Sequence, residues 1–167
     1  MVEVHLRRLR RADTSELAKL ANNRNVWDNV RDYFPHPYSE KDAEFFISSK
    51  VSEDPQITFA IEFEGRFAGI VGLEPQQDVY AHTCEIGYWI GEAYWGKGIA
   101  TQAVNLATTY AFETLGLLKV YAGVFEFNKG SMRVLEKAGY LQEAILKSSV
   151  QKNNMIVDEV RYCIFRK

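Results

Sequence analysis

The chain has 167 residues, enough for a single domain (1–167) with a sizeable core, and 47% of them are hydrophobic. Its net charge of −2 argues against a general nucleic-acid binder. Charged or polar residues interrupt every apolar run, and the N-terminal residues lack the layout of a signal peptide, so we expect a cytoplasmic protein without a membrane segment. Cys84 and Cys163 lie in strand-like apolar runs, which favours buried thiols over a disulfide or a metal site.

The charge is unevenly divided along the chain. Residues 40–92 carry eleven acidic and three basic side chains, a net charge of −8, whereas residues 93–152 carry four acidic and seven basic ones, a net charge of +3. Two interpretations stay open. In the first, charge is simply distributed unevenly over a solvated surface. In the second, the acidic part attracts a cationic substrate and the basic part attracts a polyanionic ligand.

Hydrophobic alternation predicts a first strand over residues 2–9. Asp13 followed by Glu16 is a capping-box signal for a helix that runs to about Ala21. The aromatic residues and prolines of 25–38 are typical of a loop.

Ser39 begins the second predicted helix, whose apolar residues are Ala43, Phe45, Phe46 and Ile47. A hairpin follows, with strands over 57–63 and 66–73 joined by the turn Glu64-Gly65. The remaining predicted elements are a strand over 83–91, a helix over 98–115 closed by Gly116, a strand over 118–127, a helix over 129–138, and strands over 141–150 and 155–165. Apolar positions of the helix over 98–115 are Ile99, Ala103, Leu106 and Tyr110. Strand, helix and strand over 83–127 should form one right-handed parallel unit in a mixed α/β (α+β) fold.

The glycine turn between the strand over 83–91 and the helix over 98–115 is the most informative feature. Such a turn directs unpaired N–H groups and the positive end of the helix dipole at one point, which suits a phosphate. A Walker-type loop does not fit, because Lys97 is followed by Gly98, and a dinucleotide fingerprint lacks its third glycine at Thr101. A purely structural turn is the remaining alternative.

The flanking residues carry a family resemblance. Trp95-Gly-Lys-Gly98-Ile-Ala100 after Glu85-Ile-Gly-Tyr-Trp-Ile, then Asn128-x-x-Ser131 and Glu136-Lys-Ala-Gly139-Tyr140, resemble the GNAT superfamily of acyl-CoA N-acyltransferases and its RimJ/RimL-type branch. The element order extends the resemblance over essentially the whole chain. Trp95 departs from the Arg or Gln that opens the family's glycine signature, while Gly98 and Ala100 match it.

The resemblance implies a GNAT-like fold, a mostly antiparallel sheet with helices on both faces and a splayed pair of parallel central strands. Acetyl-CoA would lie between those strands, with its pyrophosphate on the N–H groups of the glycine turn. The residues implied to bind it are Tyr88, Trp89, Ile90, Gly91, Gly96, Lys97, Gly98, Ile99, Ala100, Thr101, Asn128 and Ser131. A basic stripe, Lys129, Arg133 and Lys137, either meets the 3′-phosphate or is a solvated face.

The family usually transfers the acetyl group by direct attack in a ternary complex, and Cys84 on the presumed core face of its strand gives no reason to expect an acyl-enzyme. Glu85 faces the same side as Trp89, where removal from water would favour a general base; the alternative is a carboxylate paired with a neighbouring cation. Ser131 matches a serine near the sulfur, and Asn128 matches a CoA-contacting asparagine. The alternative, which is compatible with ligand contact, is that Asn128 and Ser131 cap a helix. Many relatives place a tyrosine that acts as the general acid where this chain has Leu135. In this chain, Ser131 or water would therefore protonate the thiolate.

The acceptor side is less defined. Tyr33, His36 and Tyr38 lie in the segment where the family has its acceptor wall, and Glu85 would also face the substrate. We expect a cationic amine acceptor, either a protein N-terminus or a small amine or amino acid. The alternatives are a non-catalytic acyl-CoA-binding module and, more remotely, a nucleotide oxidoreductase. An exposed closing strand would permit a homodimer.

Overall fold

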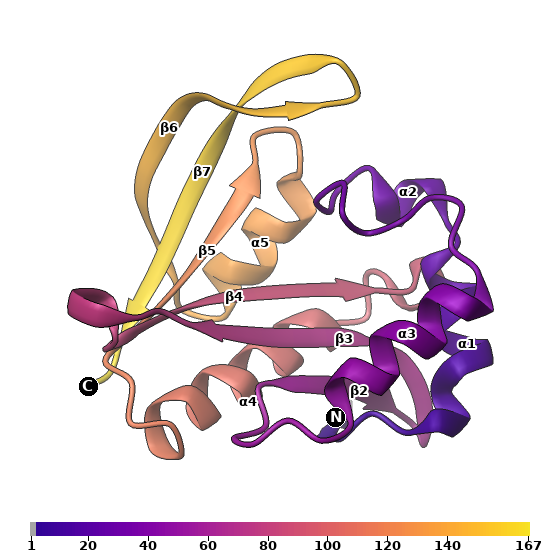
Figure 1. Ribbon diagram of the computed structural model, residues 1–167. Helices are drawn as coiled ribbons and strands as arrows, with labels where there is room; N and C mark the ends of the chain where they lie inside the picture. Colours follow the sequence, from indigo (N-terminus) through magenta and orange to yellow (C-terminus); the bar gives the residue numbers. More distant parts are fainter. Residues whose placement is uncertain (1–2) are drawn as a thin grey trace. The chain divides into compact units, whose positions relative to one another are not determined.

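The structure, a computed structural model, describes residues 3–167 (Figure 1), so Val2 of the first predicted strand lies outside the described residues. The strands are β1 (Val4–Arg7), β2 (Thr58–Phe63), β3 (Arg66–Pro75), β4 (Thr83–Ile90), β5 (Lys119–Phe125), β6 (Leu141–Lys152) and β7 (Met155–Phe165). The helices are α1 (Thr14–Ala21), α2 (Arg24–Trp27), α3 (Glu40–Lys50), α4 (Ile99–Glu113) and α5 (Lys129–Lys137), with short 3₁₀ turns η1 (Arg11–Asp13), η2 (Asp78–Tyr80) and η3 (Glu92–Tyr94). Nowhere in residues 3–167 is there a helix with the length and apolarity needed to cross a membrane.

The strands follow the order β1-β2-β3-β4-β5-β7-β6 in one seven-stranded sheet. Pairs β1–β2, β2–β3, β5–β7 and β6–β7 are antiparallel, and β4–β5 is parallel. The parallel register joins Thr83–Glu85 of β4 to Lys119–Tyr121 of β5. The predicted mixed, mostly antiparallel fold with one parallel crossover pair is therefore confirmed.

The chain divides into two compact units. The first comprises the chain up to Gly72 together with Tyr88–Ala103, and the second comprises Leu73–Gly87 together with Val104–Lys167. Strands β3 and β4 and helix α4 each contribute residues to both units.

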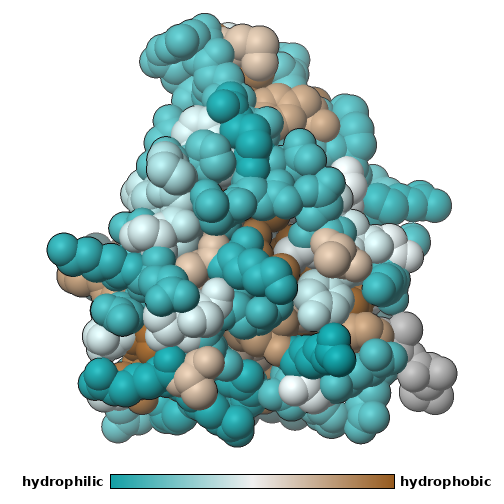
Figure 2. All heavy atoms as spheres, turned by 90° about the vertical axis from the view of Figure 1, so that its right-hand side faces the viewer, coloured by the Kyte–Doolittle hydropathy of each residue, from teal (hydrophilic) through white to brown (hydrophobic). Residues whose placement is uncertain are grey.

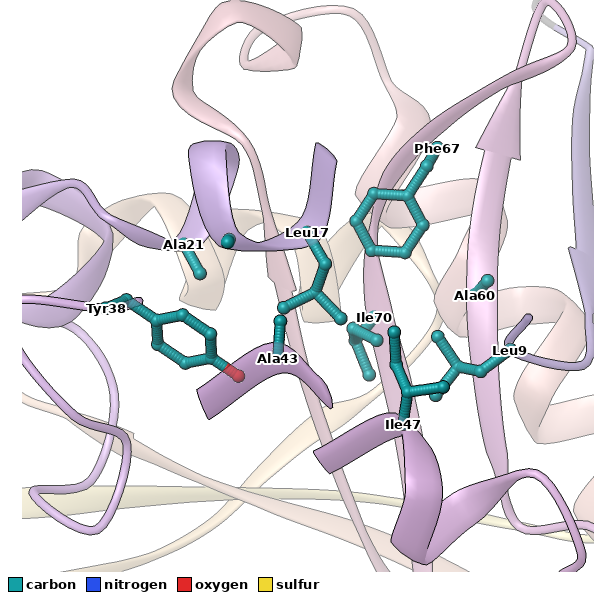
Figure 3. Close-up of a cluster of buried hydrophobic side chains, with 10 residues drawn as sticks. Leu9, Leu17, Ala21, Tyr38, Ala43, Ile47, Ala60, Phe67 and Ile70 are labelled. Carbon is teal, nitrogen blue, oxygen red and sulfur yellow. The ribbon is translucent and has the colours of Figure 1, made fainter. Parts of the chain in front are cut away.

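The core of the first unit lies where α1 and α3 pack on β2 and β3 (Figure 3). Leu17 of α1, Ile47 of α3 and Ile70 of β3 point toward one another there, all of them buried. Burying one such side chain contributes about 1.5–3 kcal/mol. Of the apolar residues named for this helix, Ala43 and Ile47 are buried in α3, whereas Phe45 is exposed.

Asp13 does not cap α1 with its side chain, contrary to the sequence prediction. Its carboxylate instead accepts two hydrogen bonds from Arg7, at 2.8 and 2.9 Å, and a third from the backbone N–H of Arg10. Arg7 also donates to Glu62 across the β1–β2 pair at 2.6 Å. The hydrogen bond that Arg7 donates to Asp13 is the main reason that the pKa of Arg7 is raised. Asp13 thus fixes the start of α1 by joining it to the sheet.

The second unit is built around β5, β7, the long β6–β7 hairpin and helix α5 (Figure 1). Asn153 and Asn154 at the hairpin tip both have positive φ, as a two-residue type I′ turn requires. In Figure 2, pale brown surface lies at the top, over this hairpin, and further brown surface appears lower on the same face. Leu106, predicted to be apolar core, is exposed; the buried residues of α4 are Ile99, Ala103, Val104, Ala107, Thr108 and Ala111.

Candidate functional site

The glycine turn in the first unit is held by a short closed loop at the end of β4. The backbone N–H of Gly91 donates to the carbonyl of Ala68 on β3, and the indole Nε1 of Trp95 donates back to the carbonyl of Ile90, at 2.9 and 2.8 Å. Turn η3 connects Gly91 to Trp95. These bonds fix where α4 begins.

Gly96 and Gly98 both lie in the left-handed region, with φ of +74° and +77°. A Cβ added at either one would meet no atom within 4 Å, and residues 95–98 are exposed. The turn therefore has open space beside its backbone, and its glycines meet a conformational requirement.

Helix α4 starts directly after this turn, at Ile99. Its first N–H groups have no acceptor within the helix, and they carry the positive end of the helix dipole. The Nζ of Lys97 lies 5.7 Å above the ring of Tyr94, which adds a cation next to the turn. This arrangement fits the diphosphate of a nucleotide-type cofactor.

Trp89 packs its side chain into the first unit rather than into open space. Its ring meets Phe34 and Phe67 edge-on, with centroid separations of 5.7 and 6.3 Å. Any contact between Trp89 or Ile90 and a ligand would therefore use mainly the backbone of β4.

The three predicted acceptor-side residues lie in different surroundings. Tyr33 is 84% exposed, and His36 stacks on Trp27 with ring centroids 5.6 Å apart. Tyr38, in contrast, is buried in the core, where burial and then the charge of Asp42 raise its pKa to about 12. The prediction that Tyr38 lines an open acceptor pocket is wrong, because its ring packs with α1 and α3 (Figure 3).

Glu85 lies on β4 of the second unit, half-buried and directly beside Tyr121 of β5. Burial, followed by the negative charge of Glu85, raises the pKa of Tyr121. Arg161 of β7 lies over the Tyr121 ring at 5.0 Å and donates to Glu159 at 3.1 Å. The predicted base therefore lies in a polar cluster.

A cavity of about 400 Å³ opens beside this cluster. Its lining residues in the second unit are Gln76, Tyr80, Thr83, Lys119, Tyr121, Glu143 and Arg161. Lys119 forms a short ion pair with Glu143 there. Sequence reasoning missed this cavity because its residues come from five separate segments; the period-2 placement of Lys119 and Tyr121 on one strand face was the only local signal.

Asn128 caps α5, since its side-chain oxygen accepts from the backbone N–H of Ser131 at 3.1 Å. The capping interpretation is thus correct, and it leaves the amide Nδ2 of Asn128 as a donor. Lys129, Arg133 and Lys137 are all exposed, and Arg133 lies 3.7 Å from Glu136.

Two buried residues bear on the chemistry. Leu135, where many relatives are expected to have a tyrosine, is fully buried. Cys84 is also fully buried, and burial raises the pKa of its thiol to about 12. Because a thiolate is the reactive form, Cys84 is not available as a nucleophile at neutral pH.

Comparison with known proteins agrees with this geometry. The family model described as "Acetyltransferase (GNAT) domain" matches residues 3–141. The chain is 40% identical over 111 residues to a probable N-acetyltransferase, YjcK, of Bacillus subtilis, covering 65% of this chain and 61% of that protein. It is 30% identical over 164 residues to the spermidine N(1)-acetyltransferase of Escherichia coli, covering 98% of this chain and 86% of that enzyme.

Among solved structures, RimJ of Mycobacterium smegmatis in complex with CoA-disulfide has the same fold, with a TM-score of 0.86 at 22% identity, covering 97% of this chain and 81% of that one. The chain belongs to the GNAT acetyltransferase family. This confirms the family predicted from the glycine turn and its flanking motifs. Acetyl-CoA is the co-substrate of this family.

Proposed function

We propose that this chain transfers the acetyl group of acetyl-CoA to a primary amine by direct attack in a ternary complex. The observation that carries the proposal is the exposed left-handed glycine turn at the start of α4. Backbone N–H groups of residues 96–101 would hold the pyrophosphate, and no side chain at Gly96 or Gly98 would obstruct it. The pantetheine amides would pair with the backbone of Tyr88–Gly91.

The reaction needs a neutral amine, a polarised thioester carbonyl and a proton for the leaving thiolate. The amine nitrogen attacks the carbonyl carbon, and a backbone N–H at Trp89 or Ile90 stabilises the oxyanion. The cationic amine first loses one proton to water, which makes it the neutral nucleophile. As the C–S bond breaks, the attacking nitrogen gives up a second proton to Glu85, directly or through water. Ser131 or water protonates the thiolate. The inaccessible Cys84 thiol is consistent with a route that has no acyl-enzyme.

The acceptor is proposed to be a cationic amine, a protein N-terminus or a small amine. The full-length similarity to a spermidine acetyltransferase supports an amine substrate. The acidic balance of residues 40–92 would attract either kind of acceptor. We keep cytoplasmic location and a homodimer as parts of this proposal.

A second candidate is a non-catalytic acyl-CoA-binding module. One observation favours it: the buried, apolar Leu135 occupies the position where a general-acid tyrosine is expected. The two candidates differ in turnover, because both bind acyl-CoA and only one consumes it.

The test is a thiol-release screen. Purified protein is incubated with acetyl-CoA and, separately, polyamines, amino acids and peptides with free N-termini, and free CoA is measured. We expect amine-dependent release with at least one class, together with acetylated product by mass spectrometry. Tight binding of acetyl-CoA without release in any arm would favour the binding module, and no binding would exclude both candidates.

Glu85→Gln should lower kcat by about 10²–10³-fold, because a positioned base typically contributes that much, while acetyl-CoA affinity stays within about threefold. The amide keeps the shape of the side chain and cannot accept the proton. Stopped-assay kinetics and calorimetry on the same preparation measure the two effects. Glu113→Gln, at the exposed end of α4, is the control. An unchanged kcat would remove Glu85 from the mechanism.

A further inference from the structure

The carboxylate of Glu92 joins the loop that supports the glycine turn to the start of α2. Its two oxygens accept hydrogen bonds from the side-chain amides of Asn23 and Asn25, at 2.6 and 3.0 Å. These residues are 69 and 67 positions away in the sequence. All three belong to the first unit.

On one side, Glu92 is part of a rigid loop. The backbone N–H of Tyr94 donates to the carbonyl of Gly91, and that of Trp95 donates to the carbonyl of Glu92. The Trp95 indole N–H donates to the carbonyl of Ile90. A Cβ at Gly91 would come within 2.9 Å of Leu20, so this loop is also packed closely against α1. The position of the Glu92 carboxylate is therefore set by the same bonds that set the glycine turn.

On the other side, both asparagines organise the segment of residues 22–38. The side-chain oxygen of Asn23 caps α2 by accepting from the N–H groups of Asn25 and Val26, while its Nδ2 donates to Glu92. The side chain of Asn22 accepts from the backbone N–H of Tyr38 at the far end of the segment.

From α2 the connection continues to the predicted acceptor side. The indole Nε1 of Trp27, the last residue of α2, donates to the carbonyl of Phe34 at 2.9 Å, and the same ring stacks on His36. A continuous set of polar and ring contacts therefore runs from the glycine turn through Glu92 and Asn23 to His36.

We propose that Glu92 is a positioning residue that couples coenzyme A binding at the glycine turn to the placement of residues 24–36, the acceptor-side segment. The inference rests on the proposed function, since it takes the turn as the coenzyme A site. The two hydrogen bonds of Glu92 go to Asn23 and Asn25, so in this proposal it is not a catalytic residue. It acts through Asn23 and Asn25, and its loss should weaken acceptor binding more than it weakens coenzyme A binding.

Hydrogen exchange with and without CoA tests this coupling without any knowledge of the acceptor. In the unaltered protein, CoA should protect the amides of residues 24–36 as well as those of the turn. In Glu92→Ala, CoA affinity should stay within about threefold, while protection of residues 24–36 falls about tenfold, the effect expected for losing charge-assisted hydrogen bonds worth a factor of ten. Glu44→Ala, an exposed carboxylate on α3, is the matched control and should behave as the unaltered protein.

A charge-neutral exchange provides the rescue. Glu92→Gln alone should lose part of the coupling, and Glu92→Gln combined with Asn25→Asp should restore it, because donor and acceptor are exchanged across the same pair. With an acceptor from the screen, Glu92→Ala should raise the acceptor KM about tenfold with kcat changed less than about twofold. Two results would overturn this inference and leave the proposed function standing. One is CoA binding without protection of residues 24–36, and the other is the same protection in Glu92→Ala as in the unaltered protein. Failure to bind CoA at all would overturn the proposed function, and this inference with it.

Discussion

Gly98→Asp should reduce acetyl-CoA affinity on the order of 100-fold or more, which calorimetry would register as loss of binding. The substitution places a carboxylate where the N–H groups at the start of α4 would receive a pyrophosphate, so that repulsion replaces attraction. The new side chain also occupies the open space beside the backbone at position 98, where an added Cβ meets no atom within 4 Å. Gly98→Trp adds no charge but keeps the steric effect and the backbone strain, and it should also abolish binding.

Gly116→Asp is the matched control for this experiment. Gly116 has the same left-handed backbone, with φ of +69°, and an added Cβ there also meets no atom within 4 Å. It follows α4 at its C-terminal end, so the strain of placing aspartate at positive φ is the same while the anion site is untouched. Equal acetyl-CoA affinity in Gly98→Asp and the unaltered protein would remove the glycine turn from the cofactor site.

The strands and the glycine turn were predictable because their signals are local. Alternation places Cys84 and Ile86 on the buried face of β4, and the predicted bounds of the last strand, 155–165, are those of β7. The hairpin turn Glu64-Gly65 has positive φ at both residues, as its sequence indicates. Each of these features is determined by neighbours within a few positions.

Features that depend on distant partners were not predictable. Asp13 has the sequence context of a helix cap, yet its carboxylate binds Arg7 of β1 instead. Helix α2 has only four residues, too few to show a helical period, and lies inside a segment that its prolines marked as a loop. The sequence also indicated which positions of α3 and α4 are apolar but not which of them are buried, and Phe45 and Leu106 are exposed.

The candidate functional residues divide in the same way. The glycine turn of the first unit is contiguous and could be identified from residues 95–101 alone, whereas the polar cluster around Glu85 in the second unit comes from several strands. Predicting that Arg161, Tyr121 and Glu85 lie together would have required the register of β4, β5 and β7, which no single segment encodes. Glu92 and its two asparagines likewise have no local sequence signature.

Gly69→Ala should be the most destabilising single-methyl change in the first unit. A Cβ at position 69 of β3 would lie 2.1 Å from the carbonyl oxygen of Trp89 and 3.0 Å from the Cα of Ile90. Both are backbone atoms of β4, which cannot rotate away as a side chain can, so the strand itself must shift. We expect a loss of at least about 3 kcal/mol in the free energy of unfolding, at the upper end for overpacked cores.

The same shift should impair catalysis, because Trp89 and Ile90 supply the proposed oxyanion donor. Gly72→Ala on the same strand is the control, since its nearest contact would be the carbonyl oxygen of Ile57 at 4.0 Å. Urea unfolding of the two variants, followed by acetyl-transfer assays below the transition, separates stability from chemistry. Because an oxyanion donor displaced by an ångström loses most of its effect, folded Gly69→Ala should retain less than about 1% of kcat. If Gly69→Ala were as stable and as active as Gly72→Ala, the close approach of β3 to β4 at Gly69 would be contradicted.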